Sequence, residues 1–153
     1  MVENNGYAES TSDRFHAAGV DIAKRADGFG MPGVVVDGHD FFAVYEAAGE
    51  AVARARGGGG PSLLECRVNR YYGHFEGDQQ TYRAPGEVDE IRRTRDCLSL
   101  FAGRVTSAGL VDAEELRRVD EEVAGLIDGA VADAKAAPEP DPSDLLTDVY
   151  VKY

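Results

Sequence analysis

The sequence predicts an α/β domain in which a small parallel sheet is followed by C-terminal helices. A strand–helix–strand pattern spans residues 33–69, and the apolar residues of its middle segment recur at steps of three and four. Helical patterns then continue from about Glu87. Because two parallel strands are joined by a crossover that is usually a helix, residues 33–69 have the form of a right-handed crossover unit.

The segment before this unit predicts a helix over roughly residues 14–26. Ser12 and Asp13 are residue types that cap helix N-termini, and Gly28 and Gly30 are types that end them.

Turn residues separate the strands and the helix of the crossover unit. A β-branched strand over 34–36 is followed by an Asp-Gly turn, and Asp40 is placed to cap the helix that follows. Four consecutive glycines, 57–60, end that helix. Residues 62–70 predict the second strand, buried on both faces because its apolar residues do not alternate.

The remaining chain predicts a long loop and then helices. Residues 71–87 show no helical or strand period, and a loop of this length is often functional. A helix from about Glu87 breaks near Arg95-Asp96 and resumes over 97–108, and Gly109 ends it.

A last helix is expected after Asp112, with a buried stripe, and three prolines end it. Its apolar positions are Leu116, Val119, Val123, Leu126 or Ile127, and Ala130. Residues 145–153 predict a closing strand or an extended tail. A parallel sheet has to be buried on both faces, and a sheet of only two or three strands is too small for this. The small number of strands therefore indicates that further strands belong to the sheet.

Composition and charge limit the classes of partner that this chain can bind. The 153 residues carry a net charge of −12 and are 43% hydrophobic, without an apolar run near the length of a membrane helix. The negative charge argues against nucleic acids and anionic membranes as partners, since their phosphates would be repelled over most of the surface, and a cytoplasmic protein is expected. Cys66 and Cys97 predict buried, reduced thiols, because their spacing fits neither a disulfide framework nor a zinc site.

The opening residues, "ENNGY", offer oxygen atoms to a hard cation. An asparagine amide oxygen and a backbone carbonyl two residues later face one point if Gly6 turns the chain sharply, and Mg²⁺ takes such ligands. An ordinary Asn-Gly turn explains the same residues.

Four segments together resemble a known family. "ENNGYAESTS" looks like the end of a thiamine diphosphate motif that begins with Gly-Asp-Gly. "GMPGVVVDGHDFFAVYEAAGEAVARAR", "GPSLLECRVNRYYGHFEGDQQTYR" and "GEVDEIRRTRD" resemble, in the same order, the second half of the alpha subunit in the thiamine-dependent 2-oxo acid dehydrogenases. This family includes the pyruvate, branched-chain and acetoin dehydrogenase first components. The resemblance runs from about Glu3 to Tyr150.

The resemblance implies a fold, cofactors and site residues. Residues 1–153 would form the C-terminal half of the thiamine diphosphate-binding domain, with a helical region from about residue 87. Asn5 would give its amide oxygen, and Tyr7 its main-chain carbonyl, to a Mg²⁺ ion that bridges the two phosphates of thiamine diphosphate. His74 would bind beside the diphosphate and act in proton transfer, for which imidazole is suited near neutral pH.

The resemblance also implies partners and a substrate class. The Gly-Asp-Gly aspartate would come from another chain, and a beta subunit would supply the glutamate that activates the aminopyrimidine, so the isolated chain is expected to be inactive. A lipoyl acyltransferase component is a further implied partner. "GHFEGDQQTYR", with Phe75 where the pyruvate branch usually has Ser, favours acetoin over pyruvate or another 2-oxo acid.

The absent half has two explanations. Either the gene is naturally split or the chain is a truncated product, and we favour the split because a lone exposed sheet edge would aggregate.

Two functional alternatives stay open. The chain could be a non-catalytic scaffold or regulatory remnant of this fold. Asp37, His39 and Asp40 suggest a metal-dependent hydrolase, although turn chemistry and helix capping explain both aspartates. Arg70 and Arg83 flank the long loop, either as ligands for phosphate or carboxylate groups or as ion-pair partners of Glu76 or Asp78.

Overall fold

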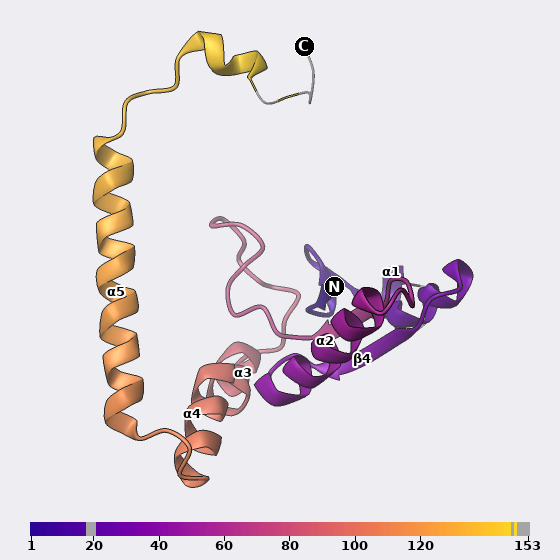
Figure 1. Cartoon of the computed structure of the whole chain (residues 1–153). Coiled ribbons are helices and arrows are strands. Elements are labelled where there is room, and N and C mark those ends of the chain that lie inside the picture. The colour runs from indigo at the N-terminus through magenta and orange to yellow at the C-terminus, as the bar shows by residue number, and fades with distance from the viewer. Residues whose placement is uncertain (18–20, 148, 150–153) are drawn as a thin grey trace. The chain divides into compact units, whose positions relative to one another are not determined.

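A parallel sheet forms the centre of the first of two units into which the chain divides. The computed structural model describes residues 1–17, 21–147 and 149 (Figure 1). The first unit comprises Met1–Ala108 and the second Gly109–Tyr153, and each is described by itself.

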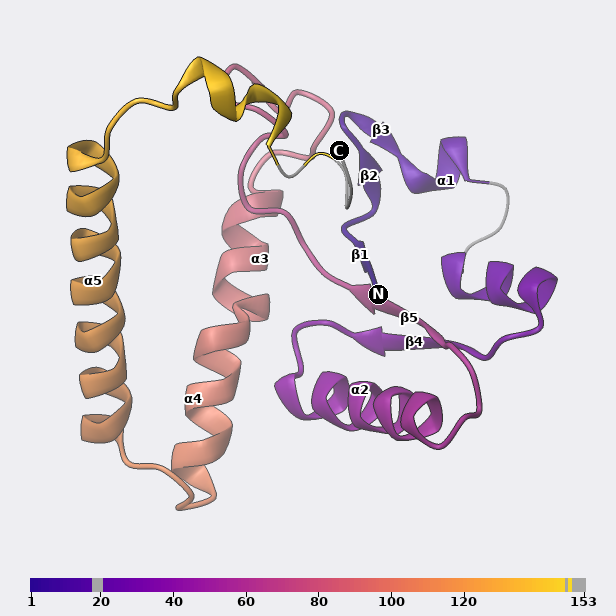
Figure 2. The same ribbon diagram turned by 45° about the horizontal axis from the view of Figure 1, so that its top comes forward.

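Three strands make up this sheet, in the order β1 (Val2–Asn4), β5 (Leu63–Arg67) and β4 (Gly33–Asp37). All are parallel, and Glu65 at the centre is the register partner of Val2 on one side and Val35 on the other. The predicted strand–helix–strand unit with a parallel sheet is therefore confirmed, and the first residues of the chain add a third strand (Figure 2).

Helix α2 (Phe41–Arg56) packs on β4 and β5 (Figure 2). The predicted cap is present: the Asp40 carboxylate accepts hydrogen bonds from the backbone N–H groups of Phe42 at 2.9 Å and Ala43 at 3.3 Å. These bonds satisfy donors that have no partner inside the helix, which is why it begins at this residue.

The 3₁₀ helix η1 (Ile22–Phe29) also packs on β4 and β5. Gly33 permits this contact, because a Cβ atom there would lie 2.1 Å from the backbone oxygen of Ala23. The next residue, Val34, borders a cavity beside α2. Since successive residues of a strand face opposite sides, η1 and α2 cover opposite faces of the sheet.

The single helix predicted over 14–26 is wrong. Helix α1 spans only Asp13–His16, and residues 18–20 lie outside the described residues. The Ser12 side chain makes no capping hydrogen bond. The N–H of Ala23 donates instead to the Glu65 carboxylate of β5, so a distant residue, not a local cap, fixes the start of η1. Gly30, with a positive φ of 65°, ends that helix.

A short antiparallel pair joins the first strand to α1. Strands β2 (Tyr7–Ala8) and β3 (Thr11–Ser12) form it, with Tyr7 opposite Ser12. Strand β2 directly follows the Asn-Asn-Gly sequence, and the chain reverses at residues 9 and 10, where Glu9 has a positive φ of 54°.

After β5, the long loop and the two helices follow the prediction. Residues 68–86 contain no helix or strand among the described residues, α3 spans Glu87–Arg95, and α4 spans Cys97–Ser107. Asp96 separates the helices and its carboxylate accepts a hydrogen bond from the Leu98 N–H at 3.1 Å. Cys97, predicted to be buried, is exposed, whereas Cys66 in β5 is buried as predicted. Cys97 is the first residue of α4 and its side chain is exposed there. The sequence pattern does not indicate which face of this helix is exposed.

The second unit contains α5 (Ala113–Ala136) and the short 3₁₀ helix η2 (Pro142–Leu146). Asp112 caps α5 as predicted, with its carboxylate 2.7 Å from the Glu115 N–H. The predicted burial of the stripe is wrong for this chain, because Val119, Val123, Leu126 and Ile127 are 50–65% exposed. An amphipathic pattern fixes which face is apolar, but burial needs a second surface.

The predicted closing strand or extended tail over 145–153 is wrong where it can be compared. Leu145 and Leu146 belong to η2, while residues 148 and 150–153 lie outside the described residues.

In the described part of the chain, no helix has the length and apolarity needed to cross a membrane.

Candidate cofactor and metal site

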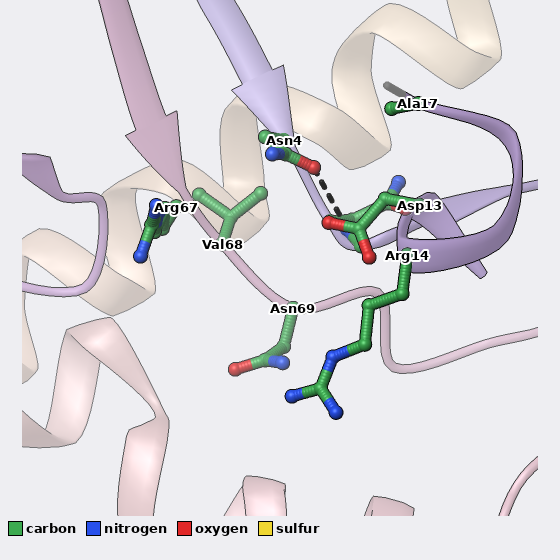
Figure 3. A pocket seen from close by; sticks show the side chains of 9 residues that line it. Asn4, Asp13, Arg14, Ala17, Arg67, Val68 and Asn69 are labelled. Atoms are coloured by element: carbon green, nitrogen blue, oxygen red, sulfur yellow. Dashed lines mark hydrogen bonds between the residues drawn. The ribbon is translucent and has the colours of Figure 1, made fainter. Parts of the chain in front are cut away.

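A cavity of about 440 Å³ opens where β1 and β5 end. The carboxyl ends of parallel strands meet there, and in open α/β sheets this edge is where ligands bind. The described residues that line it come from the two strand ends, the turn after β1, and α1 with its flank (Figure 3): Asn4, Asn5, Gly6, Asp13, Arg14, Ala17, Arg67, Val68 and Asn69.

The turn after β1 is built from two consecutive asparagine side chains. The N–H of Gly6 donates to the Asn4 Oδ1 and the N–H of Tyr7 donates to the Asn5 Oδ1, each at 3.0 Å. Gly6 has a φ of 79°, which other residues rarely adopt, and its carbonyl accepts a hydrogen bond from the Asp13 N–H at 2.8 Å. The Asn5 oxygen is thereby fixed in place, and it keeps a second acceptor position.

Asn4 is in turn oriented by a buried carboxylate. Its Nδ2 donates to Glu65 Oε1 at 2.8 Å, and Glu65 Oε2 accepts from the Ala23 N–H at 2.7 Å. The Glu65 side chain is 0% exposed, so these bonds replace its lost hydration. Because Glu65 engages the amide nitrogen of Asn4, the amide oxygen faces Gly6. The carboxylate therefore supports the turn that borders the cavity.

The cavity also contains residues that the sequence did not suggest as site residues, namely Asp13, Arg14 and Asn69. In Figure 3, Arg14 and Asn69 extend to the same side of the picture, away from Asn4. Arg67 lines the cavity too, but its guanidinium is paired with Asp21. The position of Asn69, just beyond a parallel strand, was the available signal.

Tyr7, the second predicted magnesium ligand, connects the turn to the long loop. Its ring centroid lies 5.3 Å from that of Tyr82. The guanidinium carbons of Arg83 and Arg70 lie over the Tyr7 ring at 5.2 and 6.0 Å from its centroid. The loop is therefore packed against the residue that follows the asparagine turn.

The part of the loop that carries His74 is held by Asp78. The N–H of His74 donates to Asp78 Oδ2 at 2.8 Å, and the Tyr82 hydroxyl donates to the same oxygen at 2.7 Å. The Gln80 N–H donates to the other oxygen at 2.8 Å. These hydrogen bonds, with that from the His74 backbone the strongest cause, lower the pKa of Asp78 to about 2. Arg70 donates to the Tyr82 hydroxyl at 2.6 Å and completes the network.

The structure brings two of the three predicted site residues together. Asn5 and Tyr7 share one turn, and the loop of His74 is tied to Tyr7 through Tyr82 and Asp78. The His74 side chain is exposed, and the described residues that line the cavity include Asn5 but neither Tyr7 nor His74.

The two arginines that flank the loop do not have one of their predicted roles, which was to pair with Glu76 or Asp78. Neither forms a hydrogen bond or ion pair with Glu76 or Asp78 among the described contacts: Arg70 binds Tyr82 and the Glu9 carbonyl, and Arg83 lies 3.6 Å from Glu87.

The described residues around His39 do not form the metal site that the hydrolase alternative requires. His39 Nδ1 lies 2.8 Å from Asp37 Oδ1, Arg95 pairs with the same carboxylate at 2.9 Å, and Asp40 caps α2. Burial opposes the charge of Asp37, but the His39 hydrogen bonds and the Arg95 charge outweigh it and lower its pKa. No group of three or more His, Cys, Asp or Glu residues in the described part of the chain is placed to hold a metal ion.

Known proteins match this chain over its whole length. Residues 1–143 fit the family model of the dehydrogenase E1 component. The alpha subunit of acetoin:2,6-dichlorophenolindophenol oxidoreductase from Cupriavidus necator is 65% identical over 153 residues, which are 100% of this chain and 46% of that protein. The subunit of the same name from Bacillus subtilis is 46% identical over 100% of this chain and 45% of its own length.

A pyruvate dehydrogenase E1 component subunit alpha, from Rhizobium meliloti, is 40% identical over 99% of this chain and 43% of its own length. The chain thus spans about half the length of the curated relatives it matches. The family model covers most of the chain, and the chain belongs to the dehydrogenase E1 component family.

Proposed function

We propose that this chain is part of the alpha subunit of a thiamine diphosphate-dependent dehydrogenase and holds the magnesium–diphosphate end of the cofactor. The single observation that carries the proposal is the fixed turn in which Asn5 Oδ1 accepts the Tyr7 N–H beside a cavity at the strand ends. Family membership of the chain supports the same assignment.

The chemistry of the donor set fits a magnesium ion bound to phosphates. Mg²⁺ prefers oxygen ligands and is usually held by few protein groups together with phosphate oxygens. The Asn5 amide oxygen and the Tyr7 carbonyl are such ligands, and the Asp13 carboxylate lies in the same cavity. The phosphates, water molecules and a partner chain would supply the remaining ligands.

When bound, thiamine diphosphate supplies the carbanion stabilisation that no side chain provides. The role of this chain is to orient the diphosphate end. We assign His74 to hold the loop on the cofactor and to exchange a proton near the reacting carbon. Its backbone is anchored by Asp78 while its imidazole stays exposed, an arrangement that leaves the side chain accessible to a ligand.

The substrate and the partners are proposed from the relatives. Two relatives are named for acetoin and one for pyruvate, and we propose acetoin or a 2-oxo acid as the substrate class. The proposed partners are a beta subunit, a chain that carries the Gly-Asp-Gly half, and a lipoyl acyltransferase component. A cytoplasmic location stays a prediction from composition.

Calorimetric titration tests the metal role in the assembled complex. Thiamine diphosphate is expected to bind in the presence of Mg²⁺, and Asn5→Ala to weaken this binding at least about tenfold, because it removes a metal ligand. Gln79→Ala, which removes an exposed loop amide, serves as the matched control and is expected to bind normally. Undiminished binding by Asn5→Ala would remove the metal role.

Reconstitution separates an enzyme subunit from a scaffold. Co-production with a chain that carries Gly-Asp-Gly and with a beta subunit is expected to give acetoin or 2-oxo acid turnover that depends on this chain and is lost in His74→Ala. Turnover that His74→Ala leaves unchanged would favour the scaffold.

A further inference from the structure

Arg83 is a buried cation whose donors have no hydrogen-bond acceptor. Its side chain is 4% exposed, and its Nε, Nη1 and Nη2 atoms make no hydrogen bond in the described structure. Glu87 forms an ion pair with it, but Glu87 Oε1 lies 3.6 Å from Nη1, too far for a hydrogen bond. A guanidinium stays charged at every physiological pH, and a buried one without acceptors is costly.

Arg83 is one of the residues that line a cavity of about 500 Å³ between the long loop and α3. Arg92 of α3 lines the same cavity, 4.8 Å from the ring centroid of Tyr72 and 5.8 Å from that of Tyr71. The two aromatic faces hold the second cation at the wall of the cavity.

The start of α3 adds a further positive contribution. Its N-cap residue, Gly86, lines the cavity and provides no side-chain cap, while the acidic Glu87, Asp89 and Glu90 of the first turn offset part of the positive charge of the helix N-terminus. Asp89 also lines the cavity and opposes an anion. The side-chain oxygen of Gln80, another lining residue, is buried without a hydrogen-bond partner in the described structure.

We propose that this cavity binds a small oxyanion, a phosphoryl or carboxylate group, with Arg83 and Arg92 as its cationic contacts. A planar guanidinium with free donors matches two oxygens of such a group. A phosphoryl group that carries a hydroxyl would also satisfy the Gln80 oxygen. The site shares no described lining residue with the cavity beside Asn5, and it does not require a magnesium ion.

NMR titration of the full chain tests the proposal in magnesium-free buffer at constant ionic strength. Inorganic phosphate and, separately, acetate are the probes, and the arginine Nε–H and tyrosine ring signals are observed. We expect a saturable shift at Arg83, and Arg83→Gln to weaken binding about 10- to 100-fold, the range of a charge-assisted hydrogen-bonded pair. Saturation by phosphate alone would identify a phosphoryl site, and saturation by acetate a carboxylate site.

Arg93→Gln is the matched control, since this exposed neighbour of Arg92 pairs with Glu90 outside the cavity. We expect it to change the affinity less than about twofold, and Arg92→Gln to weaken binding while leaving Arg83 packed. Arg92→Gln therefore decides the question if Arg83→Gln does not fold. The proposal is overturned if neither anion gives a saturable shift, or if Arg92→Gln binds as tightly as Arg93→Gln.

Discussion

Asp78 determines the conformation of the loop around His74. Its two carboxylate oxygens accept hydrogen bonds from His74, Gln80 and Tyr82, and Tyr82 packs on Tyr7. One half-buried loop carboxylate thus connects a predicted catalytic residue to a predicted magnesium ligand, although the two lie far apart in the sequence.

The pKa of Asp78 predicts an acid-sensitive loop. It is lowered from 3.8 to about 2 in the folded chain, so the hydrogen bonds contribute fully above the ordinary pKa and are lost as the pH falls from about 4 to about 2. Carboxyl ¹³C NMR is expected to show a midpoint near 2, whereas a midpoint near 3.8 contradicts the network. Asp78→Asn is expected to speed amide exchange at His74 and Gln80 at neutral pH, while Glu76→Gln, an exposed change in the same loop, is expected to leave it unaltered.

At the scale of elements, the contact between η1 and β4 depends on one glycine. Ala23 of η1 approaches Gly33 so closely that any side chain would meet backbone atoms. The same contact places the Ala23 N–H on Glu65, and through Glu65 it supports the asparagine turn.

A pair of glycine substitutions tests this contact. Gly33→Ala is expected to lower the free energy of unfolding by about 1–3 kcal/mol, because the new methyl group has no room. Gly49→Ala, in α2 with no atom within 4 Å of the added carbon, is expected to raise it by about 0.5–1 kcal/mol through better helix propensity. Urea denaturation measures both, and equal effects of the two substitutions would contradict the packing described.

At the scale of the whole molecule, the two units differ in how many of their side chains are buried. Leu64, Glu65 and Cys66 of β5 are buried between neighbouring strands, whereas no described residue of α5 is buried. A helix without a packed face is held mainly by its own hydrogen bonds and is marginally stable.

This difference predicts unequal amide protection. Hydrogen exchange at 64–66 is expected to be at least about tenfold slower than at 119–131, because opening β5 requires disruption of the sheet while α5 opens locally. Similar rates in both segments would contradict the division into a packed unit and an exposed helix. In the assembled complex, slower exchange of α5 would show that a partner covers its apolar stripe.

The sequence by itself determined the features that depend on near neighbours. The caps at Asp40 and Asp112, the helix break near Asp96, the parallel βαβ unit and the long loop were all predictable, because capping and periodicity act within a few residues. The asparagine turn was predictable as well, from its glycine.

Only the tertiary structure decided which side chains are buried and where distant segments meet. It placed the Glu65 carboxylate in the centre of the sheet, left the α5 stripe exposed and enclosed Arg83 against Tyr7. It also replaced the helix predicted over 14–26, since the N–H of Ala23 found its acceptor on a strand more than forty residues away. Burial depends on the full set of surfaces that pack together, and a local pattern carries no information about those surfaces.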